Sequence, residues 1–122
     1  MPGNAGELEP LWHAGVRGFK CFLAPSGVEE FPAVGPADLA VALPILARLG
    51  APLLVHAELP AHLGAVAPGE RRHAAWAASR PPEAEAAAVA LLGRLSREHG
   101  ARVHVVHLSA AESLAEIAAA RT

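Results

Sequence analysis

Three residues in this sequence have types and positions that suggest chemistry: Lys20, His56 and His107. Lys20 lies inside an apolar run, and the two histidines each stand at the end of one. Neutral imidazole is a common metal ligand, and lysine is almost never buried without a partner. A single strand-end histidine is usually a hydrogen-bonded core imidazole. Two of them on successive runs favour a metal site.

Lys20 allows two interpretations. In the first, it lies on an edge strand and its ammonium group reaches water. In the second, desolvation and nearby cations keep the amine neutral, from a reference pKa near 10.4. A neutral amine can bond to carbon dioxide, lose a proton and become a carbamate, which is an anionic metal ligand with two oxygens. The presence of His56 and His107 on the following runs favours the second interpretation.

Three short runs must position these side chains, at residues 16–23, 52–56 and 102–108. They are almost continuously apolar, which is typical of parallel strands buried on both faces. Helical patterns alternate with them in the order α-β-α-β-α-β-α, so we expect βαβ crossovers and a parallel sheet. Ligands gather at the carboxyl ends of such strands. His56 and His107 should therefore meet at one edge of the sheet.

Helices are predicted at residues 36–49 and 82–99, and a weaker one at about 6–14. Pro44 should kink or split the first of these. Ser109 to Glu112 has a capping-box pattern and predicts the start of a last helix. The long connection over residues 58–81 reads as an elaborated loop with one or two short helices.

Strand alternation gives expectations for the other polar residues. His104 and His107 are three apart, so we expect His104 to face the helix layer and His107 the other side. Cys21 alternates with Lys20 and should be a buried small apolar residue, not a nucleophile. Glu58 and Glu30 could accept hydrogen bonds behind a metal ligand, although solvated loop carboxylates are the ordinary case. The loop over residues 24–28 could offer backbone groups to a substrate.

Composition limits the class of protein. A length of 122 residues allows one domain at most. The net charge of −2 and the absence of long Lys/Arg runs argue against nucleic-acid and membrane-surface partners. One cysteine, no basic and apolar leader and no long apolar run favour a cytoplasmic globular protein.

Several segments together resemble a known family. They are Gly18-Phe19-Lys20-Cys21-Phe22-Leu23, Ser26-Gly27-Val28, Leu54-Val55-His56-Ala57-Glu58, Ser79-Arg80-Pro81 with Glu83 and Glu85, and Val103-His104-Val105-Val106-His107-Leu108-Ser109. They look like the middle of an allantoinase, one of the cyclic amidohydrolases, which also include hydantoinases and dihydroorotases. Cysteine after the lysine and the Ser-Gly-Val segment favour the allantoinases. The resemblance covers almost the whole chain.

The resemblance implies a (β/α)8 barrel with two divalent metal ions, expected to be zinc, at its carboxyl face. Lys20 matches the carboxylated lysine that bridges the metals, and His56 and His107 match two histidines that bind one of them. The implied reaction is hydrolysis of a small cyclic ureide, allantoin, to allantoate in purine breakdown. Enzymes of this family are usually homo-oligomers.

Two features of the family are missing. The sequence has no His-x-His pair, and its one aspartate, Asp38, lies in a predicted helix and cannot match the family's general base. A full barrel needs about 250 residues. We therefore expect α/β architecture with about three parallel βα units, residues 1–122 being the central strands of an incomplete amidohydrolase barrel. Its metal site should be partial or empty, and the isolated chain inactive.

Other interpretations stay open. The chain could belong to a hydantoinase or dihydroorotase, with the same chemistry on a different ring. It could also be a non-catalytic remnant that self-associates through exposed sheet edges. An unrelated flavodoxin-like or Rossmann-like domain has little support, because no Gly-x-Gly-x-x-Gly or P-loop follows any predicted strand.

Overall fold

The computed structural model of the chain describes residues 1–121. Its sheet has three strands, β1 (Phe19–Phe22), β2 (Leu53–His56) and β3 (Val103–Val105), in the order β1-β2-β3. Both neighbouring pairs are parallel. The three strands lie inside the three predicted runs and are shorter than them. The predicted parallel sheet is therefore confirmed.

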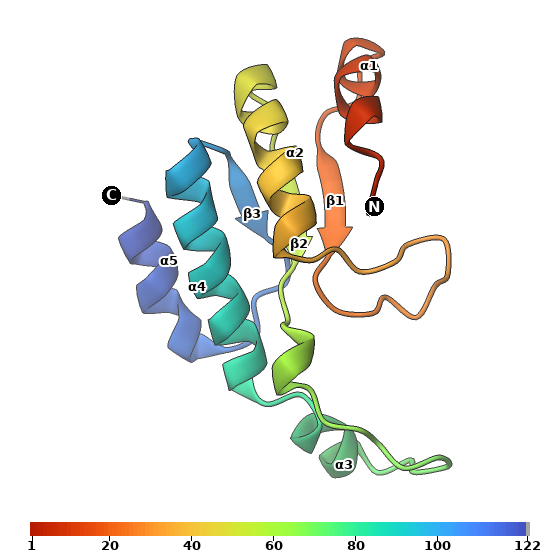
Figure 1. Cartoon of the computed structure of the whole chain (residues 1–122). Coiled ribbons are helices and arrows are strands. Elements are labelled where there is room, and N and C mark those ends of the chain that lie inside the picture. Colours follow the sequence, from red (N-terminus) through yellow and green to blue (C-terminus); the bar gives the residue numbers. More distant parts are fainter. Residues whose placement is uncertain (122) are drawn as a thin grey trace.

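The helices also follow the predicted order. Their bounds are η1 (Ala5–Glu7), α1 (Leu8–His13), α2 (Pro36–Leu49), η2 (Pro60–His62), α3 (His73–Ala78), α4 (Pro82–His99), η3 (Ala111–Ser113) and α5 (Leu114–Ala120). The helices α2 and α4, which connect successive strands, pack side by side over the same face of the sheet (Figure 1). Strands in sequential order with both crossovers on one face are arranged as in a (β/α)8 barrel, and a doubly wound sheet would carry helices on both faces.

The core lies between the sheet and this helix layer. Alternate strand residues such as Cys21, Leu53 and Val55 point into it and are buried. They pack against fully buried leucines of the helices, including Leu43 of α2 and Leu92 of α4. This burial is the main favourable term holding the helices to the sheet.

No helix within residues 1–121 lies over the opposite face of the sheet (Figure 1). This face carries Lys20, Phe22, Leu54 and His56, none of which is buried. The register places Lys20 beside Leu54 and Phe22 beside His56. Since side chains alternate along a strand, these residues share one face. This open face is the inner wall of a barrel in the expected fold.

Pro44 does not split its helix, and the other predicted outcome, a kink, stays a prediction. The helix α2 is continuous from Pro36 to Leu49 and ends at Gly50, which has a left-handed φ of 67°. Pro44 and Ala40, four residues before it, are both exposed. The carbonyl that a proline ring displaces can therefore be hydrated, and the buried face of the helix is undisturbed.

The last helix does not begin with the predicted capping box. The structure starts η3 at Ala111, with no side-chain hydrogen bond at its cap. The hydroxyl of Ser109 instead donates to the carbonyl of His107 at 3.1 Å. The backbone amides of Ser109 and Ala110 donate to Glu85 of α4. A carboxylate from a distant helix has replaced the local cap.

The connection between β2 and α4 contains the expected short helices, η2 and α3. It lies at the carboxyl end of the sheet (Figure 1). Within residues 1–121 no helix combines the length and apolar character needed to cross a bilayer.

Candidate active site

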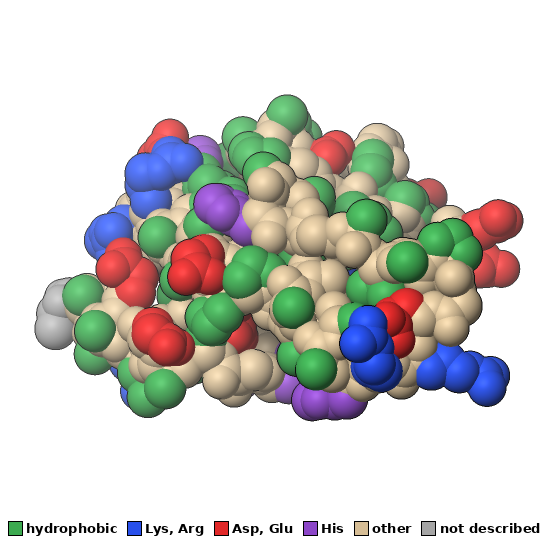
Figure 2. Space-filling view, turned by 90° about the horizontal axis from the view of Figure 1, so that it is seen from below, with side chains coloured by type: hydrophobic (Ala, Val, Ile, Leu, Met, Phe, Trp, Pro, Cys, Tyr) green, Lys and Arg blue, Asp and Glu red, His purple; other side chains and the backbone are tan. Residues whose placement is uncertain are grey.

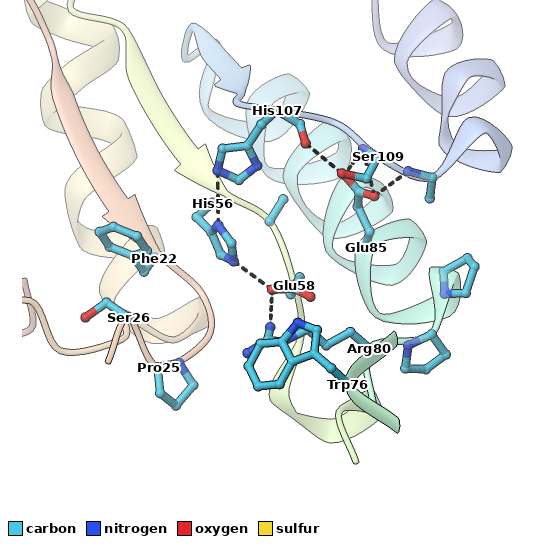
Figure 3. Close-up of a pocket in the computed structure, with 14 residues that line it drawn as sticks. Phe22, Pro25, Ser26, His56, Glu58, Trp76, Arg80, Glu85, His107 and Ser109 are labelled. Carbon is cyan, nitrogen blue, oxygen red and sulfur yellow. Dashed lines mark hydrogen bonds and ion pairs between the residues drawn. The ribbon is translucent and has the colours of Figure 1, made fainter. Parts of the chain in front are cut away.

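His56 and His107 meet at the carboxyl edge of the sheet. His56 is the last residue of β2, and His107 follows the end of β3 by two residues. His56 Nδ1 lies 3.2 Å from His107 Nε2. The rings meet edge to face, with centroids 4.9 Å apart and planes at 60° (Figure 3). The sequence predicted this meeting from strand ends alone.

His104 lies on the open face, so the prediction that it faces the helices was wrong. It is exposed and pairs in register with Leu54, while Val103 and Val105 pack against the core. The alternation argument failed because β3 ends at Val105. Beyond it His107 has a φ of 39°, the one positive value at a non-glycine residue between residues 1 and 121. This turn brings His107 back toward the open face at a cost of about 1–3 kcal/mol.

The second nitrogen of His56 is held by a carboxylate. Its Nε2 lies 2.7 Å from Glu58 Oε2, and Arg80 Nη1 donates to the same oxygen at 2.6 Å. Burial opposes ionisation of Glu58, but the hydrogen bonds from His56 and Arg80 and the charge of Arg80 outweigh it and lower the pKa of this carboxyl below its usual value. A proton on His56 Nε2 satisfies the ionised carboxylate and leaves a lone pair on Nδ1, facing His107.

Arg80 is itself held in place by Trp76 of α3. Its guanidinium carbon lies 4.7 Å from the centre of the Trp76 ring, within the range of a cation–π contact. A planar guanidinium supported by a ring is pre-organised for hydrogen bonding. The row Trp76, Arg80, Glu58, His56 therefore runs from the long connection to the strand end (Figure 3).

Glu85 of α4 holds the chain that follows His107. Its carboxylate accepts from the amide of Ser109 at 2.9 and 3.1 Å and from the amide of Ala110 at 2.6 Å. The Ser109 hydroxyl in turn reaches the His107 carbonyl. Glu85 thus satisfies two backbone donors that no local cap satisfies, and it does so beside the left-handed residue His107.

A cavity of about 530 Å³ opens beside the histidine pair. Its walls combine apolar rings with the polar groups just described, and its lining includes Phe22, Pro25, Ser26, Trp76, Pro81 and Ser109. This volume suits a small ligand. Seen from the carboxyl end of the sheet, acidic, basic and histidine side chains are scattered among apolar ones, without an extended basic patch on that face (Figure 2).

The loop after β1 reaches this cavity through Pro25 and Ser26. The Ser26 hydroxyl accepts from the Val28 amide at 3.1 Å and donates to the Phe31 carbonyl at 2.7 Å. The hydroxyl is therefore used to shape the loop. Glu30, which we considered as a possible acceptor behind a ligand, lies in an exposed turn of this loop.

Lys20 lies on the same face but does not line the cavity. Its Nζ is 3.7 Å from the centre of the Phe22 ring, which in turn lies 5.6 Å from the His56 ring. Phe22 therefore contacts both the lysine and the first histidine. The structure brings His56 and His107 together and places Lys20 beside them, exposed and across this ring.

The two histidines are within hydrogen-bonding distance of each other, and the same distance is the spacing of two ligands on one ion. Zinc–nitrogen bonds of about 2.0–2.1 Å in a tetrahedral arrangement place two nitrogens about 3.3 Å apart. The observed 3.2 Å fits this spacing. Within residues 1–121, however, no three His, Cys, Asp or Glu side chains gather as a metal site. Asp38 accepts from the Gly35 amide at the start of α2. The described residues therefore bring together two candidate ligands, His56 and His107.

Comparison with known proteins shows what the chain is similar to. The chain is 46% identical to an allantoinase of Streptomyces avermitilis and 43% identical to a mitochondrial allantoinase of Aquarana catesbeiana, in each case over 99% of its length. The chain is related to allantoinases. It spans 27% and 25% of the length of these two relatives, or about a quarter. No family model matches it.

The solved structures that are similar to this allantoinase-like chain include hydantoinases and a dihydropyrimidinase. An L-hydantoinase of Arthrobacter aurescens superposes with a TM-score of 0.91 at 32% identity, covering 99% of this chain and 28% of that one. A dihydropyrimidinase of Brevibacillus agri gives 0.84 at 31% identity, over 99% and 27%. The resemblance and the fold class, a part of an amidohydrolase (β/α)8 barrel, are thereby confirmed.

Sequence reasoning gave no role to Arg80, Glu85 or Trp76. Arg80 and Glu85 belong to a segment that carried the resemblance, yet they lie 22 and 25 residues from the groups they bind. No local periodicity reports a contact over that separation. The usable signal was the position of the Arg80-Pro81 pair immediately before a well-defined helix.

Proposed function

We propose that this allantoinase-like chain supplies His56, His107 and Lys20 to the metal site of a cyclic amidohydrolase. The observation that carries the proposal is the 3.2 Å approach of His56 Nδ1 to His107 Nε2, with Glu58 on the other nitrogen of His56. A carboxylate behind a histidine is the usual arrangement around a metal ligand. The residues 1–122 are then the central strands of a barrel.

The proposed substrate is a small cyclic ureide, and allantoin is the first candidate because the curated relatives are named allantoinases. Hydrolysis adds the oxygen of water to the ring amide carbon, breaks the carbon–nitrogen bond and returns a proton to the nitrogen. The product is the open-chain acid, allantoate. Divalent metal ions, two in number and zinc by expectation, would polarise the carbonyl and lower the pKa of bound water when present.

The chain's own residues would prepare this reaction in three ways. His56 and His107 present two nitrogen lone pairs at one point once neither of the facing atoms carries a proton. Glu58 and Arg80 fix the orientation of His56. Phe22 and Trp76 give the cavity apolar walls, which would exclude water around a planar ring.

Lys20 is proposed as the third ligand, in its carbamate form. In this chain it is exposed beside Phe22, which matches the interpretation of a solvated ammonium group, so the carbamate would require the rest of a barrel to desolvate the amine. Replacing the ammonium group by a carbamate would exchange the contact with the negative face of the ring for a bond between oxygen and metal. The family's His-x-His pair and its aspartate, which have no counterpart in this sequence, would have to come from other parts of a complete barrel.

A chimera tests the proposal. Residues 1–122 would replace the matching segment of the Streptomyces avermitilis allantoinase, and turnover of allantoin, hydantoin and dihydroorotate would be measured with zinc present. We expect allantoin turnover, with at least a 100-fold loss and loss of bound zinc in His56→Asn and His107→Asn. His13→Asn, at the exposed end of α1 and away from the open face, is the matched control. A folded, metal-loaded chimera without allantoin turnover would overturn the proposal, and turnover of hydantoin or dihydroorotate alone would favour the alternative ring.

An assay of the isolated chain tests the remaining alternative, a non-catalytic remnant. A non-catalytic remnant should neither turn over allantoin alone nor restore activity in the chimera. Metal-dependent turnover by the purified chain would reject that alternative and also our expectation that the chain alone is inactive.

We further propose a cytoplasmic location, no nucleic-acid or membrane partner and homo-oligomerisation. The amphibian relative is named mitochondrial, so the compartment should be checked by fractionation.

A further inference from the structure

Residues 80–85, which end the connection from α3 and begin α4, act near both histidines, each through one charged residue. Arg80 lies just before α4 and Glu85 in its first turn. Arg80 contacts the group behind His56, and Glu85 holds the chain after His107 (Figure 3). Neither charged group touches a histidine ring in the contacts of the described residues. Their effect on a metal would therefore be indirect.

We propose that Arg80 and Glu85 are positioning residues that set the two imidazoles of the metal site independently, Arg80 for His56 and Glu85 for His107. This inference rests on the proposed function, because it assumes that the two histidines serve as metal ligands. It assigns a different histidine to each of two charged residues in one short segment, which the histidine pair alone does not imply.

The Arg80 arm acts on the tautomer and orientation of His56. Glu58 is only 16% exposed and receives donors from both His56 Nε2 and Arg80 Nη1 on the same oxygen. Without Arg80 the carboxylate loses a charged donor and is free to rotate. His56 then loses the fixed acceptor that keeps its proton on Nε2 and its Nδ1 lone pair toward His107.

The Glu85 arm acts on the backbone that carries His107. The left-handed conformation of that residue is unfavourable for a side chain with a Cβ and needs support from its surroundings. Glu85 accepts from the amides of Ser109 and Ala110, two and three residues after His107, and the Ser109 hydroxyl donates to the His107 carbonyl. Removing the carboxylate would leave these donors to water and let the turn relax, which would move the imidazole away from His56.

The test uses the 122-residue chain labelled with nitrogen-15 in histidine. Imidazole nitrogen shifts report the tautomer of each ring without metal, and calorimetric titration with Zn²⁺ reports affinity. The variants are Arg80→Met with Arg80→Lys as its conservative partner, and Glu85→Ala with Glu85→Gln. The matched control is Glu83→Ala, because Glu83 is exposed in the same helical turn.

We expect Arg80→Met to change the His56 signals and leave those of His107 nearly unchanged, and Glu85→Ala to do the reverse. Each should weaken Zn²⁺ binding by about 10- to 100-fold, which is typical for groups behind a ligand. Arg80→Lys and Glu85→Gln, which keep a donor and an acceptor, should restore part of the loss. Glu83→Ala should match the parent chain.

The outcomes separate this inference from the proposed function. In one outcome the variants show the selective shift changes, but neither the parent chain nor the chimera binds Zn²⁺. This outcome would keep the positioning roles and overturn the metal site. Zn²⁺ binding that is unchanged in both variants would overturn the positioning roles. Equal changes at both histidines would also overturn them, since a general loss of structure gives no selectivity. If Glu85→Ala fails to fold, Glu85→Gln against Glu83→Gln decides.

Discussion

At the scale of single residues, the important features are the nitrogens of His56 and His107 and the groups behind them. Residue type and strand position were enough to predict that these two imidazoles meet. They were not enough for Lys20, which lies on the expected face but rests on Phe22, outside the cavity. The choice between a solvated ammonium and a carbamate depends on neighbours that a strand pattern does not describe.

Cys21 gives a prediction at this scale. Burial raises the pKa of its thiol from 9.0 to about 11 against smaller opposing effects of the chain terminus and Lys20. In the unfolded chain the proton leaves first, so the free energy of unfolding should fall as the pH rises from about 9 to about 11. The loss should reach at most about 2–3 kcal/mol.

The measurement is urea unfolding at several pH values, comparing the parent chain with Cys21→Ala. The fall attributable to Cys21 is the difference between the two pH profiles. Iodoacetamide should label the native thiol far more slowly than the unfolded one at pH 8. Parallel profiles, or equally fast labelling of both states, would show that the thiol is not protected.

At the scale of elements, the strand ends and the start of helix α4 position the residues of the candidate site. The bounds of α2 and α4 were predicted to the residue, because proline and glycine mark their ends. The errors were at positions where the surroundings of a residue, and not its local pattern, decide the outcome. Ser109 does not cap the last helix because Glu85 takes its amide, and Pro44 is tolerated because its side of α2 faces water.

Gly18 tests how closely β1 and β2 approach. A Cβ at this position would lie 3.0 Å from both the Pro52 carbonyl oxygen and Pro52 Cγ. The same oxygen accepts the first hydrogen bond of the pair, from the Phe19 amide. Gly18→Ala should therefore lower the free energy of unfolding by about 1–3 kcal/mol.

The control for this substitution is Gly6→Ala, since nothing lies within 4 Å of a Cβ there and its φ is not left-handed. It should change stability by no more than about 0.5 kcal/mol. Both are measured as urea midpoints with unchanged m values. Equal stability of the two variants would mean that the strands separate easily at this point.

At the scale of the whole molecule, one face of the sheet is packed and the other is open. Two residues of α2 show the contrast on the helix layer: Leu43 is fully buried and Val41 is 58% exposed. Leu43→Ala should cost about 2–5 kcal/mol through lost burial and a cavity. Val41→Ala should stay within about 0.5 kcal/mol, measured by the same unfolding assay. Similar losses in both would contradict the described packing.

The open face and the outer strands also predict association. Among the described residues β1 and β3 each pair with one strand, and Leu54 lies half-buried on the uncovered face. The isolated chain should form larger species as its concentration rises. Sedimentation velocity measures this, and Leu54→Glu should reduce it by placing a charge on the open face. A monodisperse monomer over the whole concentration range would refute the prediction.

The sequence by itself determined the order of elements, the parallel sheet, the ends of the main helices and the two histidines at strand ends. These follow from patterns that are local in the chain: apolar runs, helical spacing, and proline or glycine at boundaries. The tertiary structure alone decided what surrounds the histidines. Arg80 meets Glu58, Glu85 meets Ser109, and His104 joins the open face, because these depend on contacts and turns between elements that no local pattern encodes.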